Sequence, residues 1–155
     1  MARDSLSSQL VAAGLITSGS ASGLAAMQLD PVPLAPGLAR RFVDSNLARA
    51  SASQREAALL LASELVTSIV LHARTSLEVG VGTVDDAVVL AVTDHDPEAE
   101  TSGTPLRGRS KALVSALADD HGTVSEPHCR TIWVLLRKQG RANSAGTLQA
   151  TSSLN

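Results

Sequence analysis

The chain has 155 residues, of which 44% are hydrophobic and 18% are charged, so it can bury one ordinary core and not two. Its net charge of −2 gives no overall electrostatic footprint for nucleic acid or a membrane surface. Phe42 and Trp133 are the only aromatic residues, which argues against base stacking as a binding mode.

The cysteine content and the hydrophobic runs indicate the cellular compartment of the protein. Cys129 is the only cysteine, which excludes an intrachain disulfide and is typical of a reducing cytoplasm. No apolar run approaches the ~20 residues that span a bilayer. The run from Leu10 to Ile16 follows Arg3 and imitates a weak signal sequence, but Asp4 and its shortness argue against secretion. We expect a cytoplasmic protein that contacts neither a membrane nor nucleic acid directly.

The first third of the chain predicts an arm, a strand and a helix. Residues 1–26 are rich in Ser, Ala and Gly and are predicted to be a flexible N-terminal arm. Residues 27–34 predict an edge strand, because Pro31 and Pro33 cannot donate to a sheet ladder. Pro36 suits the first turn of a helix that runs to about Arg49.

The next segment predicts a long central helix over 53–73. Ser53 and Glu56 have capping-box spacing, which predicts the start of the helix. Neither proline nor glycine interrupts it, and apolar residues recur at helical spacing on one strip: Leu59, Ala62, Val66, Ile69 and Ala73. Further apolar residues extend this character nearly all the way round, which predicts a helix covered on more than one side: Leu61, Leu65 and Leu71.

Glu64 stands out on this helix. It shares a strip with Ser68 one turn later, on a helix that is otherwise mostly apolar. A carboxylate in such a place must be paired, solvated in a cleft or used in chemistry. We predict that Glu64 lines a cleft beside Asp94; the alternative is a glutamate that simply reaches solvent.

Two strands and a long loop follow. Alternating apolar residues over 77–81 and a valine-rich run over 87–93 predict a pair of strands, joined by a hairpin loop over 82–86. Asp94 then lies at the carboxyl end of the second strand. From Asp94 to Arg109 the sequence predicts a long loop, of the kind that is usually functional or disordered.

The last elements complete the predicted domain. Apolar residues over 112–117 predict a helix that ends near Gly122, and 123–125 and 131–137 predict two closing strands. Residues 27–138 thus form the predicted domain, and 139–155 a disordered tail. The fold class is α+β, with helices packed on one face of a mixed, mostly antiparallel sheet.

The order of these elements and their motifs together resemble one family. A helix ending E-L-V-T-x-x-V-x-H-A, a strand ending V-T-D and a G-R-S turn opening a helix resemble the GHKL (Bergerat-type) ATPase domain, an α/β sandwich. Within that family the chain is most similar to the actinobacterial anti-sigma-factor serine kinases. The resemblance covers about 29–137.

The resemblance assigns roles to individual residues. It implies that Glu64 is the catalytic carboxylate, which orients or deprotonates the attacking group. Ser68 stands where the family has the asparagine that binds magnesium; a serine hydroxyl lacks the carbonyl acceptor of that amide. Asp94 matches the aspartate that reads the adenine amino group, and Asp96 replaces the glycine expected two residues later.

The phosphate-binding turn departs further from the family pattern. Gly108 keeps its first glycine, Arg109 lies between, and Ser110 replaces its second glycine. If the position of Ser110 requires a positive φ, serine there costs ~1 kcal/mol or more. Lys111 replaces an aliphatic residue, which predicts disturbed packing. Arg107, Arg109 and Lys111 either grip a triphosphate in place of the missing amides or only keep an exposed loop solvated.

Metal sites other than the magnesium site have little support. Asp94, His95 and Asp96 are adjacent at a strand end and therefore point in opposite directions. His121, His128 and Cys129 do not have zinc spacing, and we interpret His121 as a helix-end residue.

Three functions follow from these residues. The first is an anti-sigma-type regulatory protein that binds a sigma factor or an anti-anti-sigma protein, with weak or lost ATP binding and possible homodimerisation. The second is an active ATP- and Mg-dependent serine/threonine kinase of an anti-anti-sigma partner. The third is a structural dimerisation module without nucleotide.

Overall fold

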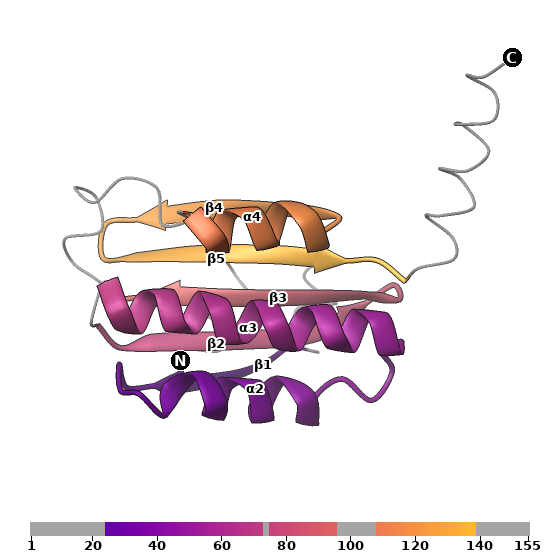
Figure 1. Ribbon diagram of the computed structural model, residues 1–155, viewed down its shortest axis with the longest axis horizontal. Coiled ribbons are helices and arrows are strands. Elements are labelled where there is room, and N and C mark those ends of the chain that lie inside the picture. Colours follow the sequence, from indigo (N-terminus) through magenta and orange to yellow (C-terminus); the bar gives the residue numbers. More distant parts are fainter. Residues whose placement is uncertain (1–23, 73–74, 96–107, 139–155) are drawn as a thin grey trace, which may run out of the picture.

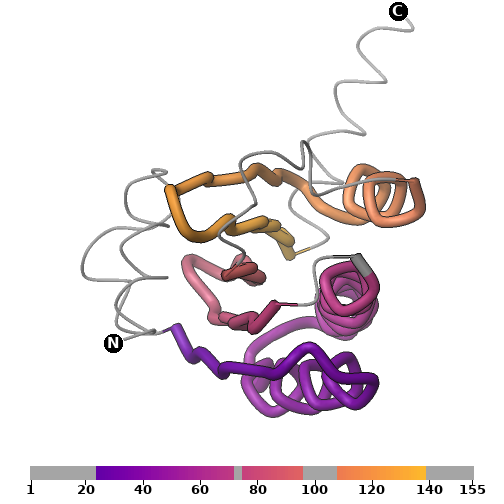
Figure 2. The backbone as a smooth tube through the Cα atoms, turned by 90° about the vertical axis from the view of Figure 1, so that its left-hand side faces the viewer, coloured from indigo at the N-terminus to yellow at the C-terminus, as the bar shows by residue number. Residues whose placement is uncertain are grey.

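A computed structural model describes residues 24–72, 75–95 and 108–138. These residues form a two-layer α+β sandwich with one five-stranded sheet (Figures 1 and 2). In chain order the elements are β1 (Ala25–Leu29), α2 (Ala35–Ser45), α3 (Ala52–His72), β2 (Leu77–Val84), β3 (Ala87–Asp94), α4 (Gly108–Leu117), β4 (Asp120–Glu126) and β5 (Cys129–Leu136).

The sheet has the order β1-β2-β3-β5-β4, and every pairing between these described strands is antiparallel. All three described helices lie on one face of it, with α3 over the central strands (Figures 1 and 2). The predicted fold class is therefore confirmed. None of the helices in the described ranges is both long and apolar enough to cross a membrane.

The core lies between the sheet and α3. Strand residues that alternate toward the helices meet the buried strip of α3: Leu77, Val79, Val81, Val88, Leu90 and Val92 meet Ala58, Leu61, Ala62, Leu65, Val66 and Ile69. The prediction that α3 is covered on more than one side is confirmed, because the helix packs against the sheet, α2 and α4. Of the residues assigned to this covering, Leu61 and Leu65 are buried, whereas Leu71 is 62% exposed.

The strand at the edge of the sheet is confirmed but begins and ends earlier than predicted. β1 pairs only with β2 among the described strands, and Pro31 and Pro33 follow it. Ala25 and Ala26, which we had assigned to the arm, belong to β1. The helix predicted to run to about Arg49 ends at Ser45. The rest of the predicted arm and the predicted tail lie outside the described residues.

The β2–β3 hairpin is tighter than predicted. Instead of a loop over 82–86, both strands continue to a two-residue turn of Asp85 and Asp86, whose φ angles are 49° and 68°. Two successive positive φ angles are those of a type I′ turn, whose twist matches that of the flanking strands. The prediction for His121 is also wrong, because His121 and Gly122 lie in β4 and not at a helix end.

The capping box that starts α3 lies two residues before the predicted one. The Ser51 amide donates to Gln54 Oε1 over 2.9 Å, and the Gln54 amide donates to Ser51 Oγ over 3.2 Å. Gln54 Nε2 also donates to the carbonyl oxygens of Asp86 (2.8 Å) and Leu136 (2.9 Å). Gln54 is only 3% exposed, so a single buried amide joins the helix start to the hairpin turn and to the end of β5.

Replacing this amide tests its importance. Gln54→Ala removes the side-chain half of the capping box, in which Gln54 Oε1 accepts from the Ser51 amide, and leaves two carbonyl acceptors without their donor. We therefore expect a loss of about 2–4 kcal/mol in the free energy of unfolding. Urea denaturation measures it. Glu56→Ala is the matched control, since Glu56 is exposed, and it should change stability by less than about 0.5 kcal/mol. The reverse order of the two effects would mean that Glu56 caps the helix.

Candidate functional site

Glu64 faces the beginning of α4. Its side chain is 20% exposed, and Oε1 lies 3.3 Å from Nε of Arg109, which is 76% exposed. Helix α3 supplies the carboxylate from its outer strip, and the first turn of α4 supplies the guanidinium. Glu64 is therefore paired with a cation, and it does not simply reach solvent.

Asp94 lies at the end of β3, on the same side of the sheet as Glu64. It alternates with Leu90 and Val92, which point into the core beneath α3. Its carboxylate accepts a hydrogen bond from the Thr75 hydroxyl. The backbone continues the ladder here, because the His95 amide donates to the Ser76 carbonyl over 3.1 Å. Asp94 is thus held by the segment that joins α3 to β2.

Arg130 is a neighbour of Asp94 that the sequence did not reveal. It is directly opposite Asp94 in the β3–β5 register, and such pairs share a face with Cβ atoms about 4.5–5.5 Å apart. Arg130 is only 7% exposed. A buried guanidinium-bearing side chain beside Asp94 changes the electrostatics around that carboxylate. Only knowledge of the strand register would have identified Arg130, and only knowledge of the path of the α3–β2 connection would have identified Thr75.

His95 adds a second polar group at this strand end. Its Nε2 atom is buried and has no hydrogen-bond partner. Burying a polar nitrogen without a partner costs free energy, so this atom is a marked exception to the usual pairing of buried polar groups.

The turn that opens α4 contains a glycine in a left-handed conformation. Gly108 has a φ of +51°, which glycine adopts without strain. Ser110 lies within the first turn of α4, is 6% exposed and is not among the residues with positive φ. The strain that we considered for Ser110 is therefore absent. Lys111 is exposed, so its side chain does not occupy a packed aliphatic position.

These residues fit a polyphosphate better than they fit magnesium. The amide groups and the dipole at the start of α4 favour an anion, and Arg109 and Lys111 add positive charge there. Ser68 is half-buried one turn beyond Glu64, where it offers a hydroxyl in place of an amide carbonyl. Within the described ranges, no three His, Cys, Asp or Glu side chains gather closely enough to hold a metal ion. Asp96 and Arg107 lie outside those ranges.

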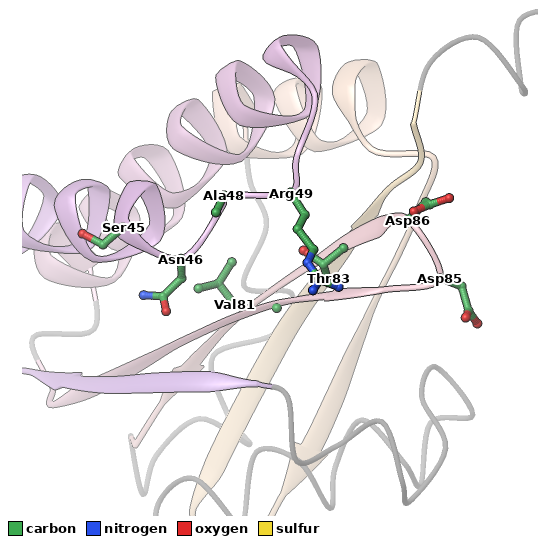
Figure 3. A pocket seen from close by; sticks show the side chains of 9 residues that line it. Ser45, Asn46, Ala48, Arg49, Val81, Thr83, Asp85 and Asp86 are labelled. Atoms are coloured by element: carbon green, nitrogen blue, oxygen red, sulfur yellow. The ribbon is translucent and has the colours of Figure 1, made fainter.

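A separate pocket of about 600 Å³ lies at the opposite end of α3, near the β2–β3 turn (Figure 3). Arg49 extends beside Thr83, while the carboxylates of Asp85 and Asp86 point away. The sequence does not predict this pocket, because its walls come from a helix connection and a strand end that are brought together only by the fold. Its wide polar opening gives it no clear ligand chemistry.

Comparisons with known proteins support the fold. The chain resembles the crystal structure of the RsbU and RsbW domains of Rv1364c from Mycobacterium tuberculosis, with a TM-score of 0.58 and 19% sequence identity. The match covers 74% of this chain and 32% of that chain, so this chain spans about a third of its length. No family model and no curated protein matches the sequence.

The ion pair between Glu64 and Arg109 gives a testable prediction. A pair with one partner this exposed contributes about 0–1 kcal/mol, so Arg109 is free to leave Glu64 for a stronger anion. A double-mutant cycle with Glu64→Gln and Arg109→Ala, measured by urea denaturation, should give a coupling energy below about 1 kcal/mol. A coupling of about 2 kcal/mol or more would mean that the pair is a fixed part of the fold.

Proposed function

We propose that the chain is an anti-sigma-type regulatory protein that acts by binding a sigma factor or an anti-anti-sigma protein, with weak or lost ATP binding. The fold is shared with the solved structure of the RsbU and RsbW domains. The residue pattern resembles the anti-sigma-factor serine-kinase branch of the GHKL family. A cytoplasmic location and a homodimer belong to this proposal.

The ion pair between Glu64 and Arg109 is the observation that carries the proposal. A general base must present a free carboxylate oxygen to the attacking hydroxyl. Without a ligand, Glu64 Oε1 instead lies 3.3 Å from a guanidinium, so Arg109 would first have to move away. Arg109 belongs to the turn that would hold the phosphates. The two groups that catalysis would use separately are thus paired with each other.

Two residues that differ from the family pattern also favour weak or lost ATP binding. ATP would supply the phosphoryl group, and magnesium would bridge its phosphates. The chain offers Ser68 in place of the magnesium-binding amide and Ser110 in place of a phosphate-loop glycine. Losing two charge-assisted contacts, at about 1.5–3 kcal/mol each, takes a micromolar site to millimolar or weaker.

An active serine/threonine kinase is the second candidate, and one observation favours it. Gly108 keeps its positive φ at the start of α4, and exposed Arg109 and Lys111 flank the first turn. In a kinase, Arg109 would move from Glu64 to the phosphates, which would free Glu64 as the base toward a partner's serine. Asp94 would then accept the adenine amino group.

Calorimetric titration of ATP, with and without magnesium, separates these candidates. For the natural chain we expect a dissociation constant of about 1 mM or weaker. Ser68→Asn restores the amide and should tighten only the magnesium-dependent binding, by about tenfold, if one contact of about 1.4 kcal/mol is regained. Ser63→Asn is the matched control, since it makes the same change elsewhere on α3 and should have no effect.

A dissociation constant of tens of micromolar or tighter for the natural chain would contradict weak binding and favour the kinase. Silence in every titration, together with no complex with a sigma factor or an anti-anti-sigma protein, would favour the dimerisation module.

A further inference from the structure

The sheet has a second buried face, opposite the helices. Figure 2 shows the described helices on one side of the sheet only. On the other side Val89, Ala91 and Trp133 form an apolar cluster with Leu24, separate from the main core. Val84, Val124 and Leu135 pack against it. We call this side the outer face.

Polar side chains on the outer face are buried as deeply as the apolar ones. Glu78 is 2%, Thr93 is 2% and Thr131 is 0% exposed, and the strand register places them side by side across β2, β3 and β5. The two threonine hydroxyls lie 2.8 Å apart. Burial raises the pKa of Glu78 above its usual value.

A sheet face whose side chains are buried this deeply requires a covering layer. The outer side of a two-layer sandwich is normally solvated, and a glutamate there keeps its carboxylate in water. Val89 is 1% and Ala91 is 0% exposed, as is usual for residues in a protein interior. Among the elements that the structure describes, no helix or strand lies over this face.

We propose that residues 1–23 form this layer and dock across the outer face as a third layer of the same domain. The chain enters β1 from this side, because Leu24 is 3% exposed and packs in the outer cluster. Five strands about 4.8 Å apart are about 19 Å across. A segment of this length spans about 35 Å even if it is fully helical, so it can cross the sheet.

The chemistry of the segment matches that of the face. Its apolar residues suit the outer cluster: Leu6, Leu10, Val11, Leu15 and Ile16. Arg3 and Asp4 are its only charged residues, and Arg3 supplies a cation of the kind that a buried carboxylate such as Glu78 requires. The C-terminal residues 139–155 contain only two leucines among mostly small and polar residues, so they suit the face less well.

The outer face also permits close approach. Its rows contain residues with small or no side chains, which leave room for another segment: Ala26, Gly80, Gly82 and Ala91. At Gly122 the space is taken by Trp133, because a Cβ there would lie 2.6 Å from the Trp133 ring. The indole therefore covers β4 at Gly122, where a layer docked on the outer face would contact it.

Trp133 is the only tryptophan in the chain, so its fluorescence reports on this face alone. The double variant Leu10→Asp/Leu15→Asp should shift its emission to the red and raise acrylamide quenching severalfold, with the far-UV circular dichroism retained. Leu148→Asp/Leu154→Asp in the C-terminal residues is the matched control and should leave both signals unchanged. Unchanged signals in both variants would overturn the proposal, and so would a change in the control alone.

A second measurement applies if the first variant unfolds. A spin label on Ser8→Cys, in a Cys129→Ser chain with every apolar residue of the segment intact, should broaden the indole N–H resonance of Trp133 at all protein concentrations. The same label on Ser144→Cys should not. No broadening from position 8 would overturn the proposal. Broadening that disappears on dilution would show that a second copy covers the face, which would overturn it too.

Discussion

The side chain of Gln54 is the interaction on which the position of the candidate site depends. It caps α3 through Ser51 and donates to the carbonyl oxygens of Asp86 and Leu136. The start of the helix is therefore fixed to the β2–β3 turn and to the end of β5. Because α3 is a continuous helix of 21 residues, fixing one end sets where the other end lies. Glu64 is thereby carried toward the opposite end of the sheet, on the side where β3 delivers Asp94.

At that end each carboxylate already has a partner. Glu64 is paired with Arg109 and Asp94 accepts from Thr75, while buried Arg130 faces Asp94 across the strands. A ligand would have to compete for both carboxylates. The exposed guanidinium of Arg109 is the easiest group to displace, because exposed ion pairs are weak. Without a ligand the charges of the candidate site thus neutralise one another, which supports the proposal that the protein acts mainly through protein contacts.

Much of the fold could be predicted from the sequence, because the pattern of apolar residues within one segment is enough to identify a strand, as in 87–93, or a helix, as in 53–73. The hairpin turn, the cap and His121 were predicted wrongly. Two neighbouring serines offered alternative caps, and only the contacts of Gln54 with distant carbonyls decide between them. Candidate site residues that belong to a local sequence motif, such as Glu64 and Asp94, could be named from the sequence. Arg130 and Thr75 could not, because their proximity to Asp94 arises from strand register and from the α3–β2 connection.

The most direct measurement mixes this chain with sigma factors and anti-anti-sigma proteins from its own genome, with and without ATP and magnesium. Complex formation is followed by size-exclusion chromatography with light scattering, and phosphoserine by mass spectrometry. We expect a complex with one of these partners whether or not nucleotide is present, equally for the natural chain and Glu64→Gln, and no phosphoserine on the partner. Phosphoserine that the natural chain forms and Glu64→Gln does not would contradict this account and identify Glu64 as a working catalytic base.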